Sequence, residues 1–168
     1  ATGTNTGTLM ADKGNLTIVS GDVIADNSAG DEACGALAQN GSIVIEGGSL
    51  VATGSDIGVY AGTGIELKGG SLTAIGNGND EAIRLGGDAV VLCADPASAL
   101  TVKNGPTNTD TFKVAIDEDL TGYTFSQTGL ATFTANSDGT YTVQPSSTQQ
   151  GTITLIEGDE PGPGDSPK

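Results

Sequence analysis

Five acidic residues lie in three polar loops of the chain, and carboxylates gathered from several loops are a common way to bind a cation. They are Asp31 and Glu32 in the first loop, Asp56 in the second, and Asp80 and Glu81 in the third. Carboxylate oxygens at about 2.3–2.6 Å are the ligands that Ca²⁺ takes in proteins. If the loops stack on one another, the sequence predicts a calcium site, with calcium as the candidate cofactor. The alternative is a row of solvated polar turns.

The same carboxylates raise the question of catalysis. A glycoside hydrolase needs two carboxylates at a fixed separation, and a calcium-dependent polysaccharide lyase adds an Arg or Lys base. Arg84 is the only arginine, and the chain has no histidine, which excludes histidine bases and histidine metal sites. Solvated turns explain the acids more simply, so we predict that the protein is not an enzyme. A lyase-like enzyme is the weakest alternative.

The composition describes one acidic, glycine-rich domain. The chain has 168 residues with 27 glycines, and 21 acidic residues against 6 basic ones give a net charge of −15. Such a surface repels phosphates, which excludes nucleic acids and anionic membranes as partners. The sequence has no apolar run of about 18 residues, so it predicts no membrane insertion.

A ten-residue phrase recurs three times and indicates the architecture. It covers residues 16–25, 43–52 and 65–74, and a degraded fourth copy begins near Ala89. Each copy alternates apolar and polar residues on both sides of a glycine, the pattern of two short strands joined by a bend. A third short strand follows each polar loop. Each repeat of about 24 residues therefore contains three strands and no helix.

Three short strands per repeat are typical of one coil of a parallel β-helix, in which equivalent residues stack about 4.8 Å apart. The sequence predicts an all-β chain with a parallel β-helix of about four coils over residues 14–104, right-handed by the general preference of parallel crossovers. An antiparallel sandwich explains the alternation but not the recurring phrase. The predicted inward ladders are Leu16/Ile43/Ile65, Ile18/Ile45/Leu67, Val23/Leu50/Leu72, Ala25/Ala52/Ala74, Ala36/Val59/Ile83 and Ala38/Ala61/Leu85.

The segments outside the solenoid lack the repeat. Residues 1–13 are predicted to be a flexible N-terminus or a partial first coil. Residues 105–156 hold all three phenylalanines and alternate like strands, so we predict a β-rich cap or hairpin unit over the open end of the solenoid. Residues 157–168 contain a Pro-Gly-Pro-Gly run and are predicted to be a flexible linker or tail.

The alternation also predicts a ligand face. Leu37, Tyr60 and Arg84 point outward on one ladder, one coil apart. The ring of Tyr60 offers a stacking surface for a sugar, and the guanidinium of Arg84 matches the carboxylate of a uronate. The alternative is that Arg84 stacks on Tyr60 and pairs with Glu81 or Asp56 as an ordinary surface contact.

The phrases at residues 43–50 and 65–72 resemble the repeats of parallel β-helix carbohydrate-binding surface proteins of clostridia and gut bacteria. The resemblance covers residues 14–104 and rests on the amino-acid sequence of the repeat. It implies a β-helix, affinity for an acidic plant polysaccharide such as polygalacturonate, and bound calcium. No residue of this chain can be carried over as a known calcium ligand of that family.

Together these observations predict a secreted or cell-surface bacterial protein that acts as a non-catalytic carbohydrate-binding module for polysaccharide. The location follows from the acidic, Gly/Thr/Ser/Asn-rich composition and from the linker. The alternative function is a structural stalk or adhesin segment of a larger surface protein, which the abundance of Ser and Thr and the scarcity of aromatics favour.

Overall fold

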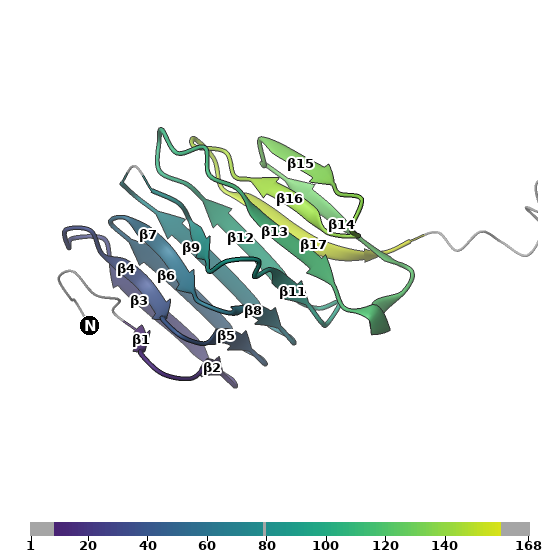
Figure 1. Cartoon of the computed structure of the whole chain (residues 1–168), viewed down its shortest axis with the longest axis horizontal. Helices are drawn as coiled ribbons and strands as arrows, with labels where there is room; N and C mark the ends of the chain where they lie inside the picture. The colour runs from purple at the N-terminus through teal and green to yellow at the C-terminus, as the bar shows by residue number, and fades with distance from the viewer. Residues whose placement is uncertain (1–8, 79, 159–168) are drawn as a thin grey trace, which may run out of the picture.

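Three sheets wind around one apolar core in the computed structural model, which describes residues 9–78 and 80–158. Figure 1 shows the strands lying side by side along the long axis, from purple at the N-terminal end to yellow at the C-terminal end. Each coil contributes one strand to each of the three sheets, which are called A, B and C below, in the order B, C, A. The protein is therefore a parallel β-helix of about four coils, as the recurring phrase predicts.

The three sheets differ in length. Sheet A has the order β1 (Leu9–Ala11), β4 (Cys34–Ala38), β7 (Ile57–Ala61), β10 (Ile83–Leu85). Sheet B has the order β2 (Leu16–Ile18), β5 (Ser42–Ile45), β8 (Gly64–Leu67), β11 (Val91–Cys93), β13 (Phe112–Ile116), β16 (Tyr141–Gln144), β15 (Thr132–Ala135). Sheet C has the order β3 (Asp22–Asn27), β6 (Ser49–Gly54), β9 (Ser71–Gly76), β12 (Ala99–Lys103), β17 (Gly151–Glu157), β14 (Tyr123–Thr128).

The predicted inward ladders are all confirmed by the strand register. In sheet B, for example, Ile43 pairs with Leu16 on one side and Ile65 on the other. The other five ladders pair in the same way. Because side chains alternate across a strand, this register turns every second residue into the core. Ile43, Leu50 and Val59 are fully buried there.

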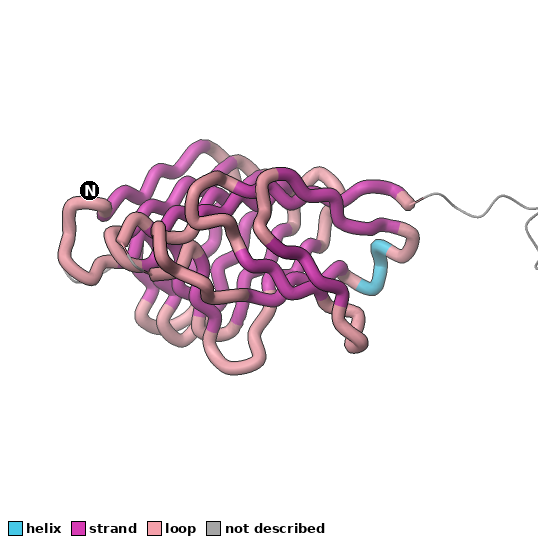
Figure 2. Tube along the Cα trace, turned by 90° about the horizontal axis from the view of Figure 1, so that it is seen from above, coloured by secondary structure: helices cyan, strands magenta, loops and turns pink. Residues whose placement is uncertain are grey.

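The C-terminal segment continues two of the sheets with antiparallel strands. Strand β13 still pairs parallel to β11, but β16 and β15 follow it antiparallel, and β17 and β14 extend sheet C antiparallel to β12. Figure 2 shows these strands at the end of the stack beside the short 3₁₀ helix Glu118–Leu120. Phe125, Phe133 and Tyr141 gather there with ring centroids 5.0–6.0 Å apart. Aromatic packing thus covers the end of the core.

The predicted terminal segments fall partly outside the described residues. Of the predicted N-terminal segment 1–13, residues 9–11 form β1 and pair parallel to β4. Of the predicted linker 157–168, Glu157 is the last residue of β17, and residues 159–168 lie outside the described part of the chain. The predicted boundary at residue 104 stays a prediction, since sheet pairing runs across it.

The two cysteines, Cys34 and Cys93, lie on different coils of the solenoid. Their separation of more than two coils predicts free thiols, and both are free in the structure. Burial raises the pKa of the Cys93 thiol to about 12, and burial also raises the pKa of the Cys34 thiol. The thiolate is the reactive form, so Cys93 should be almost inert at pH 8.

We expect a Cys34→Ser variant to show no reaction with Ellman's reagent in native buffer and one reactive thiol in guanidinium chloride. The matching Cys93→Ser variant should react slowly when native, because Cys34 is partly exposed. Rapid labelling of native Cys34→Ser protein would contradict the burial of Cys93.

Candidate functional site

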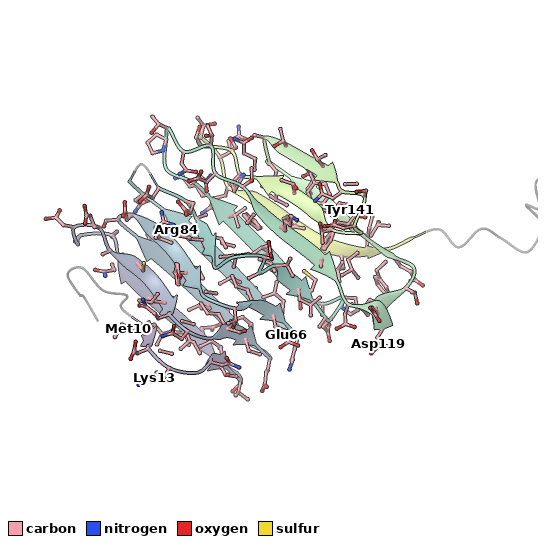
Figure 3. All side chains as sticks on the ribbon, in the orientation of Figure 1. Met10, Lys13, Glu66, Arg84, Asp119 and Tyr141 are labelled. Atoms are coloured by element: carbon pink, nitrogen blue, oxygen red, sulfur yellow. The ribbon has the colours of Figure 1, made fainter. Side chains whose placement is uncertain are left out.

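The outer face of sheet A carries the predicted ligand ladder. Leu37 pairs with Tyr60, and Tyr60 pairs with Arg84, so the three outward residues lie on adjacent strands in register. All three are half-buried. Met10 extends the ladder below Leu37 and is 52 % exposed, a residue that sequence reasoning missed because the repeated phrase starts after β1. Met10 and Arg84 mark opposite ends of this face (Figure 3).

Arg84 is held by two carboxylates at the turn that precedes β10. Its Nε donates to Oε1 of Glu81, Nη2 donates to Oε2 of Glu81 at 3.0 Å, and Nη2 lies 3.6 Å from Oδ2 of Asp80. Glu81 is only 6 % exposed, so the bidentate ion pair with Arg84 is needed to compensate its buried negative charge. The hydrogen bond with Glu81 raises the pKa of Arg84 above its usual value. Of the guanidinium nitrogens, Nη1 makes no hydrogen bond within the described residues.

Asp56 and Asp80 come together from successive turns. Asp56 precedes β7 and Asp80 precedes β10, and the carboxyl group of Asp56 is near enough to perturb that of Asp80. Hydrogen bonding with Asp56, together with partial burial and the charge of Asp56, raises the pKa of Asp80 above its ordinary value of 3.8. The turn therefore presents a close carboxylate pair beside the guanidinium of Arg84.

The structure brings together three of the five predicted metal ligands. Asp56, Asp80 and Glu81 adjoin one another around Arg84, whereas Asp31 and Glu32 are exposed in a longer loop before β4 and make no ion pair or hydrogen bond with them. Within residues 9–78 and 80–158, no group of three or more His, Cys, Asp or Glu side chains is arranged to hold a metal ion. Ca²⁺ takes six to eight oxygens, and Arg84 already occupies Glu81, so the residues fit calcium poorly. Calcium stays a prediction.

The Asp56–Asp80 pair makes the stability of the fold depend on pH. The pKa of Asp80 is higher in the folded state than in the unfolded state, so protonation of Asp80 stabilises the fold. This stabilisation is complete below the unfolded pKa near 3.8 and is lost as the pH rises through the folded pKa. We expect Asp56→Asn to raise the melting temperature at pH 7 and the advantage to shrink as pH falls through the folded pKa of Asp80. Asp31→Asn is the matched control and should do neither. A lower melting temperature for Asp56→Asn at pH 7 would contradict the repulsion.

A groove of about 570 Å³ opens beside this site, between β10 and the C-terminal strands. Glu81, Arg84 and Leu85 line one side, with Asp88 on the following loop and Asp110 and Lys113 opposite. A second groove of about 440 Å³ lies over sheet B and shares Asp88 with the first. Sequence reasoning missed Asp88, Asp110 and Lys113 because none belongs to the repeat.

A buried asparagine shapes the wall of the larger groove. Oδ1 of Asn104 accepts from the backbone N–H of Ala82 at 2.8 Å, and its Nδ2 donates to Oδ1 of Asn108 at 2.8 Å. Nδ2 of Asn108 in turn donates to Oδ2 of Asp110 at 3.1 Å. The side chain of Asp110 is thereby fixed at the groove.

Comparison with protein-family models, with curated proteins and with solved structures gives no match for this chain. No helix in the described part of the chain has the length and apolar character needed to cross a membrane. The functional conclusion thus depends on the outer face of sheet A, its acidic turn and the adjoining groove.

Proposed function

We propose that the protein is a non-catalytic carbohydrate-binding module whose saccharide lies on the outer face of sheet A. The observation that carries the proposal is the register of Leu37, Tyr60 and Arg84, with the Asp56–Asp80 pair at the adjoining turn. The partly exposed ring of Tyr60 can stack on the apolar face of a sugar. Nη1 of Arg84 can donate to a uronate carboxylate or a hydroxyl, and the carboxylate pair accepts hydroxyl protons.

Two features argue against catalysis at this face. A glycosidase holds its two carboxyl groups about 5–9.5 Å apart, with the scissile bond between them. Asp56 is near enough to Asp80 to raise its pKa by hydrogen bonding, which is closer than that separation. A lyase would need Arg84 to lose a proton, but its pairing with Glu81 raises the pKa of the guanidinium. Binding without turnover is therefore the better use of these groups.

The proposed ligand is a polysaccharide containing uronate, and the proposed location is outside a bacterial cell. The resemblance of the repeats to carbohydrate-binding surface proteins of clostridia and gut bacteria supports both. The net charge of −15 opposes an acidic polymer, so salt or a bridging divalent cation should strengthen binding. The calcium version of the proposal predicts that Ca²⁺ does this better than Mg²⁺ at matched ionic strength.

The test is calorimetric titration of a short oligogalacturonate and a neutral oligosaccharide, each with Ca²⁺, with Mg²⁺ and with EDTA. We expect oligogalacturonate to bind and Tyr60→Leu to weaken it about tenfold, the order of an aromatic stacking contact. Leucine already occupies position 37 of this ladder, so the fold should tolerate it. Tyr60→Phe keeps the ring and should bind like the wild type.

Arg84 needs a conservative variant. Arg84→Ala would leave Glu81 buried without its partner and destabilise the fold, so Arg84→Lys is the informative change. It keeps the charge but loses Nη1, the proposed donor to the ligand, and we expect oligogalacturonate binding to weaken more than binding of the neutral saccharide. Absence of binding by the wild type at millimolar saccharide would overturn the proposal and favour the structural stalk.

A further inference from the structure

Within residues 9–78 and 80–158, sheet A lacks a strand that the other two sheets possess. It ends at β10, whereas sheet B continues beyond the fourth coil with β13 and sheet C with β17. In every earlier coil a sheet A strand follows the sheet C strand. After β12, residues 104–111 occupy that place in the chain order without forming a strand, and they contain Pro106. The last strand of sheet A therefore has an open edge.

The backbone groups on that edge can be identified from the ladder below it. Val59 N–H donates to the carbonyl of Ala82, and Gly86 N–H donates to the carbonyl of Ala61. Successive residues of a parallel strand direct their N–H and C=O groups to opposite sides. The N–H and C=O of Ile83 and of Leu85 therefore point away from β7, toward the open edge.

The open edge is limited to these two residues and faces a groove. Asn104 Oδ1 already accepts from Ala82 N–H, which closes the edge on one side of Ile83. Ile83 and Leu85 both line the 570 Å³ groove, with Thr111 and Phe112 on the other side. The N–H and C=O groups of Ile83 and Leu85 thus face the groove, spaced along the chain as in any β-strand.

The charge of the groove indicates which kind of strand would fit. Its two cations are neutralised within the protein, because Arg84 pairs with Glu81 and Lys113 lies 3.6 Å from Asp138. Asp88 and Asp110 also line the groove, and neither makes an ion pair within the described residues. A cationic segment is therefore favoured. A second copy of this chain, also carrying −15, would be repelled.

We propose that the open edge of β10 and its groove form a docking site for one extended segment of a basic polypeptide, which adds to sheet A as a fifth strand. Backbone hydrogen bonds to Ile83 and Leu85 supply the register, and Asp88 and Asp110 select lysine or arginine side chains. Strand addition to an exposed sheet edge is an established mode of peptide recognition. The groove shares Arg84 with the outward ladder on which the saccharide is placed, but the peptide binds the backbone edge of β10 and not its outward side chains.

The experiment titrates a capped peptide of alternating valine and lysine into the full chain and follows backbone amide resonances. We expect the amides of Ile83 and Leu85 to shift and to become protected from hydrogen exchange. Leu85→Pro removes the N–H that faces the groove without removing a bond to β7, and it should weaken binding about tenfold. Leu85→Ala is the matched control, since alanine already stands at positions 38 and 61 of the same ladder. It should bind like the wild type.

Three further arms make the result decisive. The same peptide with methylated backbone nitrogens should not bind, and a peptide with glutamate in place of lysine should bind far more weakly. Asp88→Asn and Asp110→Asn should each weaken binding of the lysine peptide and reduce its dependence on salt. Equal binding by Leu85→Pro and Leu85→Ala, or absence of peptide binding at millimolar concentration, would overturn the proposal.

Discussion

Deleting residues 43–64 should leave a shorter protein that still folds cooperatively. Ser42 pairs with Gly64 and Ile43 with Ile65, so joining Ser42 to Ile65 places an equivalent residue at each position of the coil that remains. In a solenoid each coil contacts only its neighbours, and removing one coil takes away one interface without disturbing the others. Circular dichroism should show retained strand structure, and the urea m-value should fall with the lost surface.

A half-coil deletion is the matched control and should be far more damaging. Removing residues 43–53 places β7 directly after β4, so two sheet A strands follow each other with no sheet B or sheet C strand between them. The core then loses two of its three walls at that level, and we expect an unfolded or aggregated product. If the shorter deletion were tolerated and the full-coil deletion unfolded the protein, the coil would not be the unit of stability.

The full-coil deletion also separates the two binding proposals. It removes Tyr60 and Asp56, and saccharide binding on the outer face of sheet A should be lost. It keeps β10 as the last strand of sheet A, now above β4, so peptide binding at Ile83 and Leu85 should persist. Loss of peptide binding in a folded deletion variant would argue against docking at the β10 edge.

Replacing Gly70 by alanine should be among the most destabilising single substitutions in the chain. Gly70 has φ +70°, a conformation that residues with a Cβ rarely adopt, and a Cβ there would overlap the carbonyl oxygen of Gly48 in the coil below. The coils cannot separate locally without breaking the ladders on both sides. We expect a loss of about 4 kcal/mol in the free energy of unfolding, measured with urea.

Gly21 provides an internal comparison because it occupies the same bend in the first coil. It has φ +83°, but a Cβ there would meet no atom within 4 Å. Gly21→Ala should therefore carry only the cost of the backbone conformation, about 1 kcal/mol. Gly48 has φ +75° and lies above Gly21, so Gly48→Ala should resemble Gly70→Ala. Similar losses for Gly21→Ala and Gly70→Ala would mean that coil contact is not the cause.

The sequence alone determined the coil and the direction of its side chains. The alternation around Gly48 and Gly70 specifies two short strands and the bend between them, and repetition of the phrase places Ile43 above Leu16 and below Ile65. The same alternation placed Tyr60 between Leu37 and Arg84 on the outer face. These features are predictable because each depends on residues within one repeat and on its identical neighbour.

Only the tertiary structure decided how the non-repeating loops and the C-terminal cap contact the coils. The register places Ala33 of the coil below, and not Asp31 or Glu32, next to Asp56, so the acids of the first loop lie apart from the other three. The sequence left open whether Arg84 pairs with Glu81 or Asp56, and the shape of the turn before β10 selects Glu81, with Asp80 as the second partner. The open edge of sheet A arises because residues 104–111 leave the repeat. Periodicity encodes contacts between equivalent residues, whereas contacts between loops of different length and with a non-repeating cap depend on distances that no period specifies.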